Sequence, residues 1–190
     1  MRIALLASHE KDEALLEFAT FLKENEWELW ASAGTARYLG DHGITATDVS
    51  SIVGEPILGH RVVTLSRELH AGLLATENDQ KELDELGIKR IDLVYVTFYP
   101  LEEAVRNPLA TPNDIIEKTD IGGPTLLRSA AKGRRIVISD ASQIPQVESF
   151  IRDGELPEER ERLVTHLVAA AERRVSEYTD ASAKYWEART

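Results

Sequence analysis

The sequence predicts an α/β fold: a parallel β-sheet flanked by helices, with a long helical C-terminal extension. Short apolar runs alternate along the chain with segments whose apolar residues recur at a helical period. Small or polar residues follow most of these runs, as is usual where a buried strand ends in a loop. Consecutive strand–helix–strand units place their strands parallel, with right-handed crossovers.

One domain is expected from 190 residues, 21.2 kDa and a hydrophobic share of 43%, which is enough to bury a core. We divide the chain into residues 1–155, the sheet domain, and residues 156–190, a helix packed on that domain or on a second subunit. No linker, repeat or low-complexity segment interrupts the sequence.

The strands are recognised by their apolar runs, of which the segment before Phe98 is the clearest. The expected strands are residues 2–7, 27–31, 44–49, 91–97 and 135–139.

The helices are recognised by apolar stripes and by their terminal residues. Pro124 in a first turn and Gly133 just past an end delimit one of them, and Ser142 is expected to N-cap the segment that contains Pro145. Residues 50–61 are expected to form a loop. The expected helices are residues 12–25, 36–43, 65–75, 78–86, 124–132 and 157–190.

Composition excludes several classes of protein. The chain has no cysteine, so disulfides, cysteine-based zinc sites and thiol catalysis are excluded. A formal charge of −11 argues against a broad nucleic-acid or anionic-membrane surface. The N-terminal segment turns acidic and helical where a signal peptide would be cleaved, and no apolar run reaches the roughly 18 residues of a membrane helix. We therefore expect a cytoplasmic protein.

The loop Ser32-Ala33-Gly34-Thr35 joins an expected strand to an expected helix. Free backbone N–H groups at a helix N-terminus attract anions, and two hydroxyls beside a glycine suit a phosphate. Ser8-His9-Glu10-Lys11 occupies the same place after the first strand. The alternative for both loops is an ordinary N-cap turn without a ligand.

A second candidate is Asp120-Ile121-Gly122-Gly123, directly before Pro124. Its backbone amides are expected to face a ligand, with the carboxylate of Asp120 beside them. Lys132 lies eight residues after Pro124, so it reaches Asp120 only if the helix is short or bent. The alternative is an Asp N-cap and a solvated lysine.

Other residues complete the candidate set. Arg61 and Thr64 flank an apolar pair after Gly59 and could contact a phosphate, and Tyr99 follows the clearest strand. The five histidines (9, 42, 60, 70 and 166) have no metal-ligand spacing, so no metal site is expected.

In this order along the chain, these segments resemble the IMP cyclohydrolase domain of the bifunctional enzyme that also carries AICAR formyltransferase. The strongest stretch is residues 120–132, DIGGPTLLRSAAK, with further matches at residues 31–37, 59–65, 70–75 and 99–100, and the resemblance covers nearly the whole chain. It implies a methylglyoxal-synthase-like fold. The formyltransferase half of that enzyme has no counterpart in the 190 residues.

The resemblance implies a role for each candidate residue. Asp120, Lys132 and Tyr99 fall on catalytic positions, with Lys132 paired to Asp120 for proton transfer. The amides of Ile121 and Gly122 would hold the developing oxyanion. Substrate and phosphate positions fall on Lys11, Ser32, Gly34, Thr35, Arg61, Thr64, Ile121, Gly122 and Gly123.

The chain also departs from that family. Val63 stands where the family has a catalytic lysine, and Thr97 replaces an asparagine. Ser66 and Arg67 replace a histidine and a proline, and Ala33 replaces a glycine.

The resemblance implies ring closure of FAICAR to IMP with loss of water, without metal or organic cofactor. Expected partners are purine-pathway nucleotides (FAICAR, IMP, AICAR), a second copy of the chain in a homodimer, and a separate formyltransferase. One alternative is a non-catalytic or regulatory nucleotide-binding module of the same fold, favoured by Val63. Another is methylglyoxal synthase, whose first loop is similar to Ser8–Lys11, although its Gly-Gly-Asp loop is not found near residues 54–61.

Overall fold

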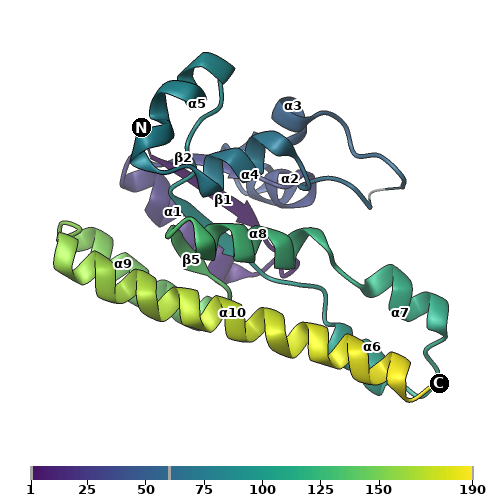
Figure 1. Cartoon of the computed structure of the whole chain (residues 1–190). Coiled ribbons are helices and arrows are strands. Elements are labelled where there is room, and N and C mark those ends of the chain that lie inside the picture. The colour runs from purple at the N-terminus through teal and green to yellow at the C-terminus, as the bar shows by residue number, and fades with distance from the viewer. Residues whose placement is uncertain (1, 60, 190) are drawn as a thin grey trace.

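The computed structural model describes residues 2–59 and 61–189, so His60 lies outside the described residues. At its centre is a five-stranded, all-parallel sheet in the order β3-β2-β1-β4-β5 (Figure 1). The predicted α/β architecture is confirmed. The strands are β1 (Ile3–Ala7), β2 (Glu28–Ala31), β3 (Thr47–Asp48), β4 (Leu93–Val96) and β5 (Ile136–Ile138).

The two central strands are apolar on both faces because helices cover the sheet on both sides. Leu5 of β1 pairs with Trp30 of β2 and with Val94 of β4, and all three are buried. Strands of this kind read as continuous apolar runs rather than as alternating ones. The parallel register brings the carboxyl ends of the strands to one edge of the sheet.

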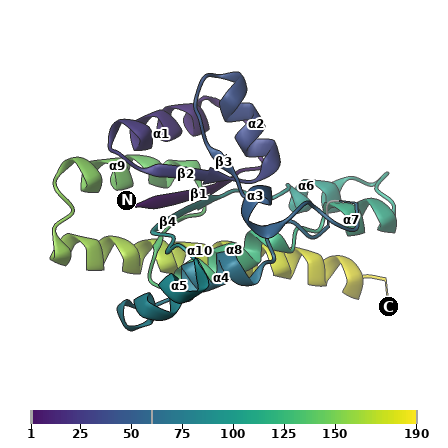
Figure 2. The ribbon, with the colours of Figure 1, turned by 90° about the horizontal axis from the view of Figure 1, so that it is seen from above.

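Figure 2 shows two helical layers, one on each face of the sheet. One layer contains α1 (Glu13–Glu24), α2 (Ala33–Asp41) and α9 (Ile144–Arg152). The other contains α4 (Arg67–Leu74), α5 (Gln80–Leu86), α8 (Gly122–Lys132) and α10 (Pro157–Glu187). The short helices α3 (Ser50–Val53), α6 (Leu101–Arg106) and α7 (Pro112–Lys118) gather beyond the ends of the strands. Residues Glu77–Asp79 and Ala141–Gln143 form 3₁₀ turns.

Several local predictions were wrong. Of the strand expected at residues 44–49 only Thr47–Asp48 pairs with β2, since the residues before it remain outside the ladder at the sheet edge. Residues 50–61 include the helix α3, and α6 and α7 were not predicted at all. Ser142 is not an N-cap: the carboxylate of Asp140 accepts hydrogen bonds from the amide and hydroxyl of Ser142. A carboxylate placed directly after β5 takes the capping position first.

The long helix α10 packs on its own domain, against α8, β5 and α6. Most of its predicted apolar stripe is buried there, and Leu167, Ala171, Val175 and Tyr178 form its centre. The sequence analysis left open that this helix packs on a second subunit instead. Because these side chains are covered within the chain, they give the homodimer no support, and it stays a prediction.

A buried arginine connects the start of β5 to the C-terminal end of α4. Arg135, directly before β5, is only 3% exposed. Its guanidinium donates to the backbone oxygens of Leu73 (2.8 Å from Nε), Ala75 and Gly72 at the C-terminal end of α4. Positive charge at a helix C-terminus satisfies carbonyl groups that the helix itself leaves without donors. No helix in the described part of the chain has the length and apolarity to cross a membrane.

We expect Arg135→Met to lower the free energy of unfolding by about 2–4 kcal/mol, because three buried carbonyl groups lose a charged donor. Lys81→Met is the control, since Lys81 forms an exposed i,i+4 pair with Glu85 on α5 and should cost less than about 1 kcal/mol. Urea unfolding monitored by circular dichroism measures both. Equal losses for the two variants would contradict a capping role for Arg135.

Candidate functional site

A cavity of about 1000 Å³ opens where the carboxyl ends of the strands meet the loops that follow them. In open parallel sheets ligands bind at this edge. Ten of the twelve predicted site residues line it, and Thr35 and Lys132 do not. The ten are Lys11, Ser32, Gly34, Arg61, Thr64, Tyr99, Asp120, Ile121, Gly122 and Gly123.

One end of the cavity is the loop that starts α2. Ser32 and Gly34 line it, and Ser32 Oγ bonds Thr35 Oγ1 at 3.1 Å rather than capping the helix. Thr35 is fully buried, and its contact with substrate stays a prediction. In this structure its hydroxyl contacts Lys11 Nζ at 3.2 Å and the backbone N–H of Ser8 at 3.2 Å. Thr35 therefore orders the two loops that line this end.

Lys11 is the cation of this end. Its ammonium also donates to the backbone oxygen of Ser8, and burial lowers the pKa of Lys11 from its ordinary value. A partly dehydrated ammonium beside the N-terminus of α2 is well suited to an anion, because the helix contributes free N–H groups and a positive dipole end.

Thr97, at the end of β4, connects this end of the cavity to the centre of the sheet. Its hydroxyl contacts Ser8 Oγ at 2.8 Å and accepts from the backbone N–H of His9 at 2.9 Å. The threonine that replaces the family's asparagine thus fixes the loop after β1.

The opposite end of the cavity contains Asp120. Its Oδ1 accepts from the backbone N–H of Gly123 at 3.0 Å, so Asp120 caps α8. Burial raises the pKa of the Asp120 carboxyl, while the backbone N–H groups of Gly123 and Gly122 and the charge of His9 partly oppose that increase. The expectation that the Gly123 amide is free to face a ligand was wrong, because the capping carboxylate occupies it.

The two glycines allow unusually close packing around that carboxyl group. A Cβ atom at Gly123 would lie 2.7 Å from Asp120 Oδ2 and 2.9 Å from Phe98 Cδ1. One at Gly122 would lie 2.5 Å from Thr64 Oγ1. Real Cβ atoms do not approach so closely, so each position requires glycine as long as its neighbours stay in place.

Tyr99 and His9 lie between the two ends. Their ring centroids are 4.2 Å apart with the planes inclined by 40°, and both residues line the cavity. The phenol of Tyr99 is half exposed, at 49%, so its hydroxyl is accessible to a ligand. These rings form the wall between Lys11 and Asp120.

Arg61 lies at the mouth of the cavity on the loop before α4. Its guanidinium pairs with Glu117 of α7 at 2.6 Å, and both side chains are exposed. An anionic ligand would have to compete with Glu117 for this arginine. Val63 also lines the cavity, at the position where the resemblance expects a lysine.

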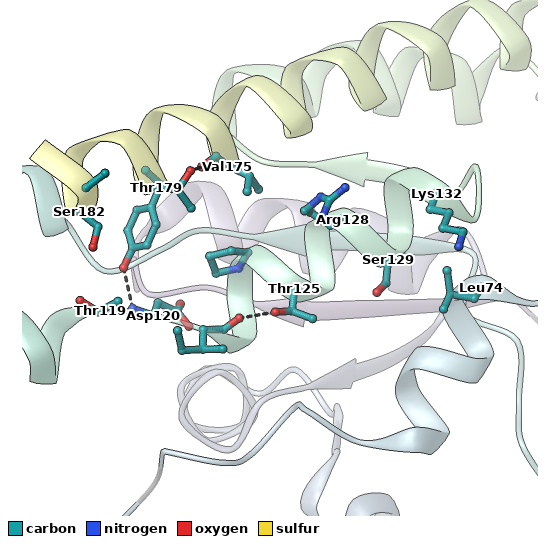
Figure 3. A pocket seen from close by; sticks show the side chains of 14 residues that line it. Leu74, Thr119, Asp120, Thr125, Arg128, Ser129, Lys132, Val175, Thr179 and Ser182 are labelled. Atoms are coloured by element: carbon teal, nitrogen blue, oxygen red, sulfur yellow. Dashed lines mark hydrogen bonds between the residues drawn. The ribbon is translucent and has the colours of Figure 1, made fainter.

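Lys132 lies at the opposite end of α8 from Asp120 (Figure 3). The helix is continuous from Gly122 to Lys132, and eleven residues at about 1.5 Å each separate its ends by about 16 Å. The predicted pairing of Lys132 with Asp120 is therefore wrong. Lys132 instead lines a neighbouring groove of about 790 Å³ between α8 and α10, which adjoins the main cavity at Thr119, Asp120 and Ile121.

Comparison with known proteins identifies the family. The sequence model of the MGS-like domain matches residues 14–125, which is more than half of the chain. The chain belongs to the MGS-like domain family. The crystal structure of ForH superposes on this MGS-like domain with a TM-score of 0.86 and 33% identity, covering 99% of this chain and 98% of that one.

Curated relatives of this MGS-like domain are much longer proteins. The bifunctional purine biosynthesis protein PurH of Persephonella marina is 42% identical over 140 residues, which are 72% of this chain and 27% of the relative. PurH of Aquifex aeolicus is 39% identical over 159 residues, 80% of this chain and 31% of the relative. The chain thus spans a quarter to a third of the length of the curated relatives it matches.

The sequence analysis missed four residues around this cavity. His9 was considered as a metal ligand and as part of the loop after the first strand but given no role at the site, and Tyr178 was considered only as part of an apolar stripe. Ser182 and Trp186, from the last turns of α10, line the cavity as well. Nothing in the local sequence marks these α10 residues, because their position depends on how α10 crosses the domain.

Gly123→Ala should lower the free energy of unfolding by about 1–3 kcal/mol, because the added methyl group displaces Asp120 or Phe98. Gly40→Ala is the control: it lies within α2 with nothing within 4 Å of the added Cβ. That variant should be neutral or stabilised by up to about 1 kcal/mol. Urea unfolding measures both variants; an unchanged free energy of unfolding in Gly123→Ala would contradict the packing argument.

Asp120→Asn should be more stable than the wild type at pH 7. Because burial raises the folded-state pKa of Asp120, ionisation destabilises the folded chain once the pH exceeds the unfolded value of about 4. The advantage of the variant should therefore shrink as the pH falls below about 4. Urea midpoints from pH 3 to pH 8 measure it, with Asp84→Asn on exposed α5 as control. A variant less stable than wild type at pH 7 would contradict this assignment.

Proposed function

We propose that the protein is an IMP cyclohydrolase, which closes the ring of FAICAR to give IMP and water in purine biosynthesis. The observation that carries the proposal is a partly buried Asp120 carboxyl in the same cavity as Tyr99, Lys11 and the loop that starts α2. Similarity to proteins named for purine biosynthesis supports the substrate class. The proposed substrate carries one phosphate group and one pair of reacting groups, which matches the two ends of the cavity.

The phosphate is proposed to bind at the N-terminus of α2. Ser32 and Gly34 line this end, and Lys11 supplies a cation. Arg61 is proposed to leave Glu117 and reach the phosphate from the mouth of the cavity, since an arginine pairs with phosphate bidentately. In a chain of charge −11, these local cations are needed to hold an anion.

The reacting groups are proposed to lie between Asp120 and Tyr99. The carboxamide nitrogen attacks the formyl carbon and forms a C–N bond, while Asp120 takes a proton from that nitrogen and Tyr99 donates one to the formyl oxygen, which becomes a hydroxyl group. The C–O bond then breaks: Asp120 returns its proton to the departing hydroxyl, which leaves as water, and the former formamide nitrogen gives its proton to Tyr99 as the C=N bond forms. The amides of Ile121 and Gly122 are proposed to bind the oxygen where negative charge develops, which requires the Gly122 N–H to leave the Asp120 carboxyl that it contacts in the free protein. Burial of Asp120 makes it a stronger base, because burial raises the carboxyl pKa above its ordinary value.

A second candidate function is a nucleotide-binding module without catalysis. Two observations favour it: Val63 lines the cavity where the resemblance expects a lysine, and Lys132 lies far from Asp120. The chain then lacks both cations that the resemblance assigns to the reacting end. Such a module would bind IMP at the same loops and leave FAICAR unchanged.

Purified protein incubated with FAICAR, followed by the absorbance of IMP, tests the proposal. Wild type should form IMP, and Asp120→Asn should lose a factor of about 10²–10³ in kcat, corresponding to about 3–4 kcal/mol of transition-state stabilisation. Asp84→Asn should keep full activity. Tight binding of IMP without turnover by wild type would contradict the cyclohydrolase proposal and support the binding module.

Two variants test whether a lysine at position 63 or at position 132 affects turnover. Val63→Lys should keep or raise turnover, because it adds a positive charge beside the oxyanion position. Lys132→Met should keep turnover within about threefold of wild type, since Lys132 lines the other groove. A loss of turnover of about 100-fold in Lys132→Met would support the role that the resemblance assigns to this lysine. Thermal melting of both variants ensures comparison at equal folded concentration.

The remaining proposals concern partners. The proposed substrate is already formylated, so a formyl-transfer reaction must supply it, and a separate formyltransferase is the proposed partner. Homodimer formation and a cytoplasmic location are also proposed. Light scattering at tens of micromolar tests the homodimer, and a monomer at that concentration would contradict it.

A further inference from the structure

The C-terminal helix α10 reaches the candidate site although it lies outside the segment that the family model matches, residues 14–125. Two of its residues, Ser182 and Trp186, line the main cavity. A third, Tyr178, is 2% exposed and touches the loop that carries Asp120. This contact is the closest connection between α10 and the proposed reacting end.

The hydroxyl of Tyr178 accepts a hydrogen bond from the backbone N–H of Asp120 at 2.6 Å. It also donates to the backbone oxygen of Lys118, at the end of α7, at 3.3 Å. One phenol thus spans the segment 118–120 and fixes where the chain turns from α7 into α8. On the α8 side, the carboxyl group of Asp120 accepts a hydrogen bond from the backbone N–H of Gly123. Asp120 is consequently fixed from both directions.

The same region of α10 also holds the loop that carries Tyr99. The ring of Phe98 packs edge-on against Tyr178 with centroids 5.0 Å apart. Arg174, one turn before Tyr178, lies 5.1 Å from the Phe98 ring and pairs with Glu102 of α6 at 2.5 Å. Tyr99 lies between Phe98 and α6, so α10 contacts the chain on both sides of it.

We infer that Tyr178 is a positioning residue, which sets the Asp120 carboxyl relative to Tyr99; its catalytic consequence rests on the proposed function. Without the hydroxyl, the buried N–H of Asp120 has no acceptor, and burying such a donor is costly. The loop would shift toward water, and a displacement of about 1 Å at a reacting group can cost on the order of 10²-fold in rate. Substrate binding, which depends on the distant phosphate end, would change little.

The experiment compares two tyrosine-to-phenylalanine variants on the same helix. Tyr178→Phe removes the hydroxyl and keeps the ring against Phe98. Tyr185→Phe is the matched control: Tyr185 is 4% exposed, and its hydroxyl has no hydrogen-bond partner among the described residues. Both variants are assayed at equal folded concentration, determined by thermal melting.

For FAICAR turnover we expect kcat of Tyr178→Phe to fall 10- to 100-fold with KM within threefold of wild type, and Tyr185→Phe to match wild type. A purely structural role would lower the folded fraction and leave kcat per folded molecule unchanged. Wild-type kcat in Tyr178→Phe, or an equal loss in Tyr185→Phe, would overturn the inference while the proposed function stands.

If the wild type does not convert FAICAR, amide hydrogen exchange tests the positioning role of Tyr178. Exchange at residues 119–123 should be at least tenfold faster in Tyr178→Phe than in wild type or Tyr185→Phe. That result together with inactive wild type would reject the cyclohydrolase proposal and retain the positioning role. Unchanged exchange at these residues would overturn the positioning role whatever the activity.

Discussion

The candidate site depends on the burial of one carboxyl group, that of Asp120. It is kept in place by the amide of Gly123, by the close approach of two glycines, and by the backbone contact to Tyr178. Burial raises its pKa, so the folded chain loses stability to keep this group ionised. A charged group retained at such a cost is typical of functional sites.

The chain carries more acidic than basic residues, and most of the cations described here contact a carboxylate or carbonyl groups. Arg135 lies inside the domain and binds carbonyl groups at the end of α4, and Arg174 pairs with Glu102. Arg61 pairs with Glu117 at the cavity mouth. Lys11 is different, because its ammonium contacts only neutral oxygen atoms in the described structure and lies in the cavity. It is therefore the cation best placed to meet an incoming anion.

Departures from the family pattern have local structural explanations in this chain. Thr97 bonds the loop after β1 through its hydroxyl, and Ser66 N-caps α4 by accepting from the N–H of Leu69. These substitutions therefore keep the loops ordered with other side chains. Val63 alone removes a charge from the cavity wall without another cation replacing it at that position.

The sequence by itself determined the α/β class, the strands, and most of the residues around the cavity. Buried strands are recognisable because both of their faces are apolar, and parallel connections require their ends to meet at one edge. The glycines before Pro124 marked a place where other groups can approach the backbone closely. The inward orientation of Thr35, the distance from Lys132 to Asp120, and the contact of Tyr178 with that loop were decided only by the tertiary structure. The orientation of Thr35 and the contact of Tyr178 depend on how a helix crosses the sheet, which periodicity along one helix does not specify. The distance from Lys132 to Asp120 depends on α8 being continuous from Gly122 to Lys132.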